Sequence, residues 1–245
     1  MGKKMAFEPE QVAVGGIDVM AFESMQQLAG FIIRDDGSVF AGAAIAINPE
    51  KVMKAQQDAE LRRILNNAEL RYADGMGVVK VMQKKLGKKV QRVPGCETWE
   101  ALMHRAADKK VPVFLIGAKP EVLQATQTKL EAFGVPVVGA QDGYFKDENA
   151  LIEQVRQSGA KVVTVAMGSP KQELFIEKAK KVLPDAYFMG VGGTYDVFTG
   201  NVQRAPALWC KLNLEWAYRL LSQPSRITRQ WNLVVYLWLY LRGKL

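Results

Sequence analysis

Residues 161–206 read KVVTVAMGSPKQELFIEKAKKVLPDAYFMGVGGTYDVFTGNVQRAP. Two short apolar runs, Val162–Met167 and Ala186–Val191, each end in a turn of small residues, and a helical pattern lies between them. Short apolar runs bounded by such turns are typical of buried strands. The order strand, helix, strand predicts two parallel strands of an open α/β sheet, which binds its ligands at the carboxyl ends of its strands.

The turns after these two runs are candidate ligand sites. The first combines Gly168 and Ser169 with Pro170. Ser is a good N-cap and proline is tolerated at the first helical position, so we predict that a helix begins here and that its N–H groups can bind a phosphate. In the second turn, Gly192 and Gly193 let the backbone approach a ligand. Ordinary strand-to-helix turns use the same residues, so the turns alone do not decide the function.

The same alternation continues over most of the chain. Apolar runs at 15–20, 40–47, 70–73, 111–116 and 135–139 predict further strands, and helical patterns follow them. We therefore predict an α/β protein with a mostly parallel, Rossmann-like sheet flanked by helices. A chain of 245 residues suits one large domain, or one domain with an appendage.

Two polar residues follow predicted strands directly. Asn48 precedes Pro49 at the start of a helical pattern, and Asp74 lies in a tight turn before another one. Either residue can be simply an N-cap. A carboxylate in such a turn is also fixed in direction and partly shielded, as a general base must be. Arg92, which precedes a further helix, is expected near the same rim of the sheet.

Basic residues are concentrated near the C-terminus. The formal net charge is +8, and the residues from 200 onward carry +6 of it. A localised basic surface attracts phosphates, nucleic acid or anionic lipid. We expect a catalytic core at 1–206 and a helical, basic appendage at 207–245. The basic residues from position 200 onward are Arg204, Lys211, Arg219, Arg226, Arg229, Arg242 and Lys244.

Segment 233–241, LVVYLWLYL, is the most apolar part of this appendage. It is too short to span a bilayer, but its aromatic residues and basic neighbours predict a segment lying on an anionic membrane surface. A helix packed on the sheet, or in a homo-oligomer interface, fits the same pattern. The N-terminus has no apolar core of signal-peptide length, so we expect a cytoplasmic protein, peripheral on the inner face of the plasma membrane.

The sequence offers few metal ligands. There is one histidine, His104, and the two cysteines, Cys96 and Cys210, have no CxxC spacing. The Asp-x-Asp pair, through which many sugar transferases hold a divalent ion, is absent from the sequence. We therefore expect neither a metal nor a cofactor, and we expect arginines and helix N-termini to supply positive charge.

Several motifs, in order along the chain, resemble the WecG/TagA/CpsF family of bacterial glycosyltransferases. They are INPE (47–50), ADGMGVV (73–79) with RVPG (92–95), MGSPKQE (167–173), and GVGGTYDVFTGNVQRAP (190–206) with LEWAYRLLSQPSRITRQ (214–230). The similarity runs from Ile17 to about Gln230 and is greatest with the enterobacterial branch of the family. One departure is Ala46, where the family often has Thr.

This resemblance implies an inverting, metal-independent transfer of an N-acetylmannosamine-type sugar from UDP. The acceptor it implies is N-acetylglucosamine (GlcNAc) on undecaprenyl diphosphate. The enterobacterial branch transfers N-acetylmannosaminuronic acid, and N-acetylmannosamine transfer of the teichoic-acid linkage type is the alternative. The site residues it implies are Asp74 as catalytic base, Asn48, Arg92 and Gln172 in the pocket, and Arg219, Arg226 and Arg229 in an appendage that closes over the nucleotide sugar.

The sequence leaves open which cation binds the donor carboxylate and which acid is the base. A uronic acid donor needs a cation for its carboxylate, and Lys171, Arg92 and Arg204 are candidates. Asp196 could compete with Asp74 as the base, although we favour a role in capping its own loop. A nucleotide- or nucleic-acid-binding module is disfavoured because the tail aromatics alternate with Leu and Val, so we expect no nucleic-acid partner. A dinucleotide oxidoreductase is disfavoured because residues 190–193, GVGG, do not continue as GxGxxG.

Overall fold

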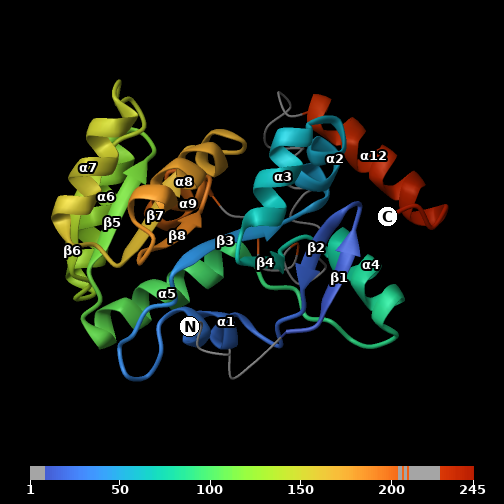
Figure 1. The fold of residues 1–245 in the computed structure, drawn as a ribbon, viewed down its shortest axis with the longest axis horizontal. Coiled ribbons are helices and arrows are strands. Elements are labelled where there is room, and N and C mark those ends of the chain that lie inside the picture. The colour runs from blue at the N-terminus through green and yellow to red at the C-terminus, as the bar shows by residue number, and fades with distance from the viewer. Residues whose placement is uncertain (1–8, 204–205, 207–208, 210–226) are drawn as a thin grey trace.

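The computed structural model describes residues 9–203, 206, 209 and 227–245, with the side chains of residues 227–231 outside that description. The strands are β1 (Gln11–Val14), β2 (Ile17–Met20), β3 (Gly42–Ile47), β4 (Leu70–Ala73), β5 (Val113–Gly117), β6 (Val137–Gln141), β7 (Val162–Ala166) and β8 (Tyr187–Gly190). They form one eight-stranded sheet in the order β1-β2-β4-β3-β8-β7-β5-β6 (Figure 1). Neighbouring strands are parallel except for β1 and β2. This sheet confirms the predicted α/β fold.

Helices cover both faces of the sheet. They are α1 (Met25–Ile32), α2 (Pro49–Gln57), α3 (Ala59–Asn67), α4 (Met76–Leu86), α5 (Gly95–Lys109), α6 (Pro120–Ala132), α7 (Glu148–Ser158), α8 (Lys171–Val182), α9 (Thr194–Thr199) and α12 (Ile227–Leu241). One hydrophobic core contains side chains of α2, α3, α4, α7, α8 and α12, and the other contains side chains of α1, α5 and α6 with Tyr195 of α9. Successive side chains of β8 point into different cores, Phe188 into the first and Tyr187 into the second. This is expected because successive residues of a strand point to opposite faces of the sheet.

β1 is a strand that the sequence analysis does not predict. It pairs antiparallel with β2 through the turn Gly15-Gly16, whose φ angles are 59° and 86°. Residues with a Cβ rarely adopt such angles, so a Gly-Gly pair favours this tight hairpin. The glycine pair is the signal for β1 in the sequence, while the strand itself is only four residues long.

The C-terminal segment contains a helix where an interfacial segment is predicted. Residues 233–241 form most of α12, which packs on α2 and places Tyr236 in the hydrophobic core. Most of the first half of the expected appendage, residues 207–208 and 210–226, lies outside the described residues. Among the described helices, none combines the length and the apolar character that crossing a membrane requires.

Candidate active site

The polar and glycine residues singled out in the sequence meet at one edge of the sheet. Four neighbouring parallel strands, β4, β3, β8 and β7, end there. Asp74 follows β4, Asn48 follows β3, and Gly192 and Gly168 lie in the turns after β8 and β7. Residues separated by more than a hundred positions in the chain are thereby brought to a single rim, which is where open parallel sheets bind ligands.

Asp74 is held in place through its backbone and its carboxylate. Its N–H donates to the carbonyl of Ile47 (3.0 Å) at the end of the neighbouring strand. Its Oδ1 accepts a hydrogen bond from the N–H of Gly95 (3.1 Å), the first residue of α5. An Arg92 guanidinium nitrogen lies 3.6 Å from the same oxygen, and the Arg92 Nε donates to the Asp74 carbonyl. About a quarter of the Asp74 side chain is exposed (26%), so a substrate hydroxyl can reach this oriented carboxylate.

Asn48 lies directly beside the Asp74 turn. A Cβ built on Gly75 would stand 2.6 Å from Cδ of Pro49 and 3.3 Å from Cα of Asn48, so the two strand ends fit closely only because residue 75 is glycine. The Asn48 Oδ1 accepts from the N–H of Lys51 (2.9 Å) and caps α2. The predicted capping role of Asn48 is therefore confirmed.

Gln172 lies beneath the glycine turn that follows β8. Its side chain is 3% exposed, and its Oε1 accepts from the N–H of Gly192 (3.0 Å). Its Nε2 donates to the Oε1 of Glu173 (3.1 Å). The same Glu173 oxygen lies 2.9 Å from the Nζ of Lys51, in a pair whose side chains are 1% and 9% exposed. This chain of contacts joins the Asn48 helix to the Gly192 turn.

Lys51 and Glu173 are the members of the site that sequence reasoning missed. Burial raises the pKa of the Glu173 carboxyl. The charge and hydrogen bond of Lys51, together with the hydrogen bond from the Gln172 amide, lower this pKa by more than burial raises it, so it lies below the ordinary 4.5. Glu173 thus carries a buried negative charge that Lys51 compensates. Both residues stand inside the quoted motifs or next to them, but their pairing joins α2 to α8 and no local pattern indicates it.

The turn after β7 differs from its prediction in one respect. Pro170 is the N-cap and α8 begins at Lys171, so Ser169 does not cap the helix as predicted. Ser169 instead buries its Oγ, which has no hydrogen-bond partner among the described residues. The capping preference of Ser acts only when it directly precedes the helix, and here Pro170 takes that position.

The backbone is open at three glycines of the rim. At Gly168, Gly192 and Gly193, no described atom lies within 4 Å of the place where a Cβ would stand. Gly168 and Gly192 also have positive φ angles of 74° and 55°, which favour glycine. A diphosphate can therefore approach the backbone at both turns.

Asp196, the competing acid, lies in the first turn of α9. Its Oδ1 accepts from the side-chain amide of Asn201 (2.8 Å), and its carbonyl accepts from the N–H of Val202 (3.0 Å). Both contacts join α9 to the loop that follows it. They agree with the loop-capping role expected for this residue.

The structure does not place the predicted arginines of the C-terminal region at this rim. Arg204, Arg219 and Arg226 lie outside the described residues, and Arg229 belongs to α12 with a side chain that is not described. Their closure over a nucleotide sugar stays a prediction. Among the described residues, no group of three His, Cys, Asp or Glu side chains could hold a metal ion.

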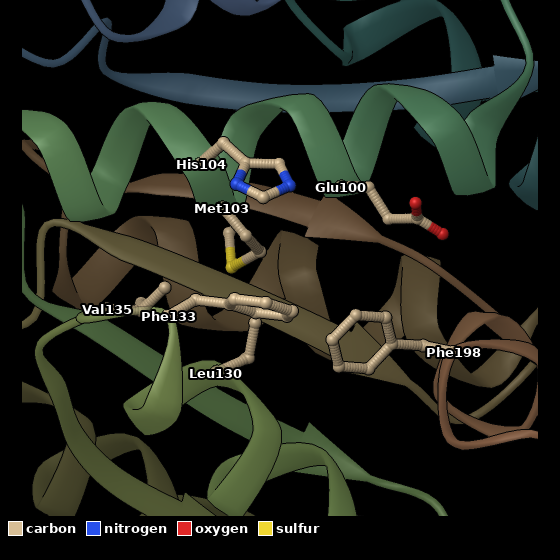
Figure 2. Close-up of a pocket in the computed structure, with 7 residues that line it drawn as sticks. All are labelled: Glu100, Met103, His104, Leu130, Phe133, Val135 and Phe198. Carbon is tan, nitrogen blue, oxygen red and sulfur yellow. The ribbon is translucent and has the colours of Figure 1, made fainter.

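A hollow between α5, α6 and α9 lies apart from these residues. Figure 2 shows the rings of His104, Phe133 and Phe198 along it, with Phe133 between the other two. The His104 and Phe133 rings lie 5.6 Å apart, so His104 packs against an aromatic side chain. This hollow contains none of the predicted site residues.

An α/β sheet with an oriented carboxylate, an arginine and open glycine turns along its carboxyl edge defines a ligand-binding site of the kind that nucleotide-dependent enzymes use. Residues 12–245 match the sequence profile of the glycosyl transferase WecG/TagA/CpsF family. The chain belongs to this family of glycosyltransferases, and the resemblance found in its motifs is confirmed at that level.

Proposed function

We propose that this glycosyltransferase moves N-acetylmannosaminuronic acid from UDP to undecaprenyl-diphosphate-linked GlcNAc, with inversion at the anomeric carbon. The observation that carries the proposal is the placement of Asp74. Its carboxylate is partly exposed, is oriented by the Gly95 N–H, and lies beside Arg92 and Asn48 on the rim. This is the position that a general base needs, next to groups that can bind the substrates.

In the proposed reaction, Asp74 accepts the proton of the acceptor hydroxyl. The hydroxyl oxygen forms a bond to the anomeric carbon of the donor, and the bond from that carbon to the UDP oxygen breaks on the opposite face. The departing diphosphate gains negative charge. The open turns at Gly168 and Gly192 let a diphosphate approach the backbone, and the N-terminus of α8 offers N–H groups for it.

The choice of donor depends on its carboxylate. N-acetylmannosaminuronic acid carries one, whereas N-acetylmannosamine, the donor of the teichoic-acid alternative, does not. Lys171 is the first residue of α8 and is exposed, so its ammonium can bind an anion at the rim. Arg92 already contacts Asp74, which favours Lys171 over Arg92 for the donor carboxylate.

We propose that the reaction needs no divalent metal. The sequence lacks an Asp-x-Asp pair, and the described residues contain no group of three metal-binding side chains. Arg219, Arg226 and Arg229 of the appendage would then supply the charge that a metal ion provides elsewhere, because a guanidinium binds phosphate through two parallel hydrogen bonds.

We further propose that residues 1–206 form the catalytic core and residues 207–245 an appendage that binds the inner face of the plasma membrane. Support comes from the exposed apolar side chains of α12 and from the basic charge of this region. A lipid-linked acceptor would then reach the rim from the membrane surface. A homo-oligomer through α12 is the competing arrangement.

The test is turnover with a synthetic lipid-diphosphate-GlcNAc acceptor and a panel of UDP-hexosamine donors, with and without EDTA. We expect transfer from the uronic acid donor, an inverted product, and equal rates in both buffers. Transfer from UDP-N-acetylmannosamine alone would favour the teichoic-acid type. Binding of UDP without any transfer would favour a non-catalytic nucleotide-binding module.

A further inference from the structure

α12 has two apolar faces, only one of which is used by the fold. Tyr236 is 4% exposed and belongs to the core. The opposite face carries Val234, Leu237, Trp238 and Leu241, whose exposed fractions lie between 47% and 73%. These four residues are spaced at i, i+3, i+4 and i+7, so they form one continuous stripe along the helix.

The packing of Tyr236 and of Leu245, which follows the helix, fixes this stripe toward the outside. A Cβ built on Gly77 of α4 would stand 3.0 Å from the Tyr236 ring, so that ring lies directly against the α4 backbone. Leu245 is 7% exposed and approaches Gly15 in the hairpin turn. Because Tyr236 and Leu245 are both packed into the core, α12 cannot turn its exposed stripe inward without losing them.

Cationic side chains lie on both margins of the stripe. On one margin, the Nζ of Lys84 stands 5.6 Å from the centre of the Tyr240 ring. Gly77, Lys80 and Lys84 share one face of α4, and that face is turned toward α12. On the other margin, the guanidinium of Arg242 lies 4.0 Å from the centre of the Trp238 ring.

Further lysines lie on α4 and in the turn after it, where Lys85 donates to the carbonyl of Ala13 and Lys88 pairs with Glu10. Lys80, Lys84, Lys85, Lys88 and Lys89 are all exposed. In the sequence this run fits an ordinary solvated face. In the fold, however, this run lies beside α12, which is the one described helix that presents a stripe of large exposed apolar side chains.

We propose that the exposed stripe of α12 and the lysine row of α4 form one docking surface for an anionic lipid bilayer. This inference rests on the proposed function and extends it, since it assigns half of the membrane contact to the catalytic core. The stripe would enter the headgroup region, and the lysines beside it would bind lipid phosphates.

Two other occupants fit less well. A second copy docking on this surface would bring one cationic margin close to another, which like charges oppose. A nucleic acid would need aromatic rings arranged as a stacking platform along a basic groove, whereas here Leu237 and Leu241 accompany Trp238.

The docking surface also has a defined relation to the site. α4 begins two residues after Asp74, and Lys84 is ten residues from Asp74. With a helical rise of 1.5 Å per residue, Lys84 lies roughly 12 Å along the α4 axis from Met76, which follows the proposed base by two residues. A bilayer on this surface would therefore hold a membrane-anchored acceptor close to the rim.

The experiment is co-sedimentation of the full chain with vesicles of phosphatidylcholine alone or mixed with phosphatidylglycerol. The test variant is Lys80→Glu, Lys84→Glu and Lys89→Glu together. Its control is Lys146→Glu, Lys161→Glu and Lys181→Glu, three exposed lysines on other parts of the surface with the same change in net charge. Thermal melting establishes that both variants fold.

We expect the wild-type chain to bind the anionic vesicles more tightly than the neutral ones. The α4 variant should lose affinity on the order of a hundredfold, since each basic residue near an anionic surface contributes roughly fivefold. The control should bind nearly as the wild type does. A second variant, Leu237→Gln with Leu241→Gln, should weaken binding to both kinds of vesicle.

Equal losses in the α4 variant and in its control would overturn the proposal, because net charge alone would then explain binding. It would equally be overturned if the wild type formed a dimer that masks Trp238 fluorescence from quenchers, or bound a DNA duplex better than the vesicles. Turnover of a short-chain, water-soluble acceptor by the wild type reports on the proposed function separately. Failure of that assay alone would reject the reaction and leave the lipid surface standing.

Discussion

The ammonium of Lys51 lies 2.9 Å from the carboxylate of Glu173, with both side chains almost fully removed from solvent. Lys51 belongs to the first turn of the helix that Asn48 caps, and Glu173 adjoins Gln172, which holds the Gly192 turn. The ion pair thus fixes two strand ends of the rim relative to each other.

Replacing Lys51 with Met should destabilise the protein by about 3–5 kcal/mol, because it leaves the buried Glu173 charge without compensation. Lys54→Met is the matched control on the same helix. Lys54 pairs with Glu50 at 3.1 Å, but both side chains are about 30% exposed, so the loss should stay below about 1 kcal/mol. Urea unfolding measures both, and equal losses would contradict this reading of the buried pair.

The same pair predicts how stability depends on pH. The pKa of Glu173 is lower in the folded chain than its ordinary 4.5. The folded state therefore gains stability above pH 4.5, and this gain is lost as the pH falls below 4.5 and through the folded pKa. In Glu173→Gln the slope of unfolding free energy against pH should be smaller in this acidic window. An unchanged slope would show that the Glu173 carboxyl does not contribute.

Asp74→Asn should lower kcat by about 10²–10⁴ while the melting temperature stays close to that of the wild type. The amide keeps the shape and can still accept the hydrogen bond from Gly95, but it cannot take a proton. Asp196→Asn is the control, because Asp196 contacts Asn201 within its own loop. If Asp196→Asn were the inactive variant, the roles of the two acids would have to be exchanged.

Gly193→Ala tests whether a ligand approaches the glycine turn. Gly193 has a φ of −84°, which alanine adopts readily, and no described atom lies within 4 Å of the added methyl group. The loss of stability should therefore stay below about 1 kcal/mol, as for a change at a helix N-cap. We expect KM for the donor to rise. Gly30→Ala, within α1, should leave KM unchanged and shows the effect of an alanine away from the rim.

Tyr236→Ala and Trp238→Ala separate the two faces of α12. Tyr236 is packed against Gly77 and is 4% exposed, so its truncation should cost about 3–5 kcal/mol, as for other large core aromatics. Trp238 is 47% exposed, and its truncation should cost much less stability. Trp238→Ala should weaken vesicle binding, although this variant folds as the wild type does. Chemical unfolding and co-sedimentation of the two variants give both comparisons.

The sequence was sufficient to predict the layers of the fold and the rim of the sheet. Alternating apolar runs and helical patterns predict the parallel strands, and Asn48, Asp74 and the glycine turns follow from their positions at strand ends. Two features depended on context that a local pattern does not contain. A four-residue edge strand such as β1 is defined by its partner, and Pro170 displaces Ser169 from the N-cap position.

The interior of the site was less accessible to prediction. Lys51 and Glu173 are separated by more than a hundred residues, and charged residues are usually solvated. Only the fold shows that they meet in the interior and that Gln172 connects them to Gly192. The lysines of α4 illustrate the same limit, because their relation to α12 depends on how the two helices pack.

β8 is the last of the described strands along the chain, yet it lies in the middle of the sheet, between β3 and β7. Tyr187 pairs with Gly42 on one side and with Val162 on the other. Until β8 has been synthesised and inserted, the chain can form only two separate half-sheets, one carrying Asp74 and Asn48 and the other carrying Gly168. Closing such distant pairings is slow, so a nascent chain that stops before residue 187 would expose two apolar sheet edges to aggregation and to chaperones.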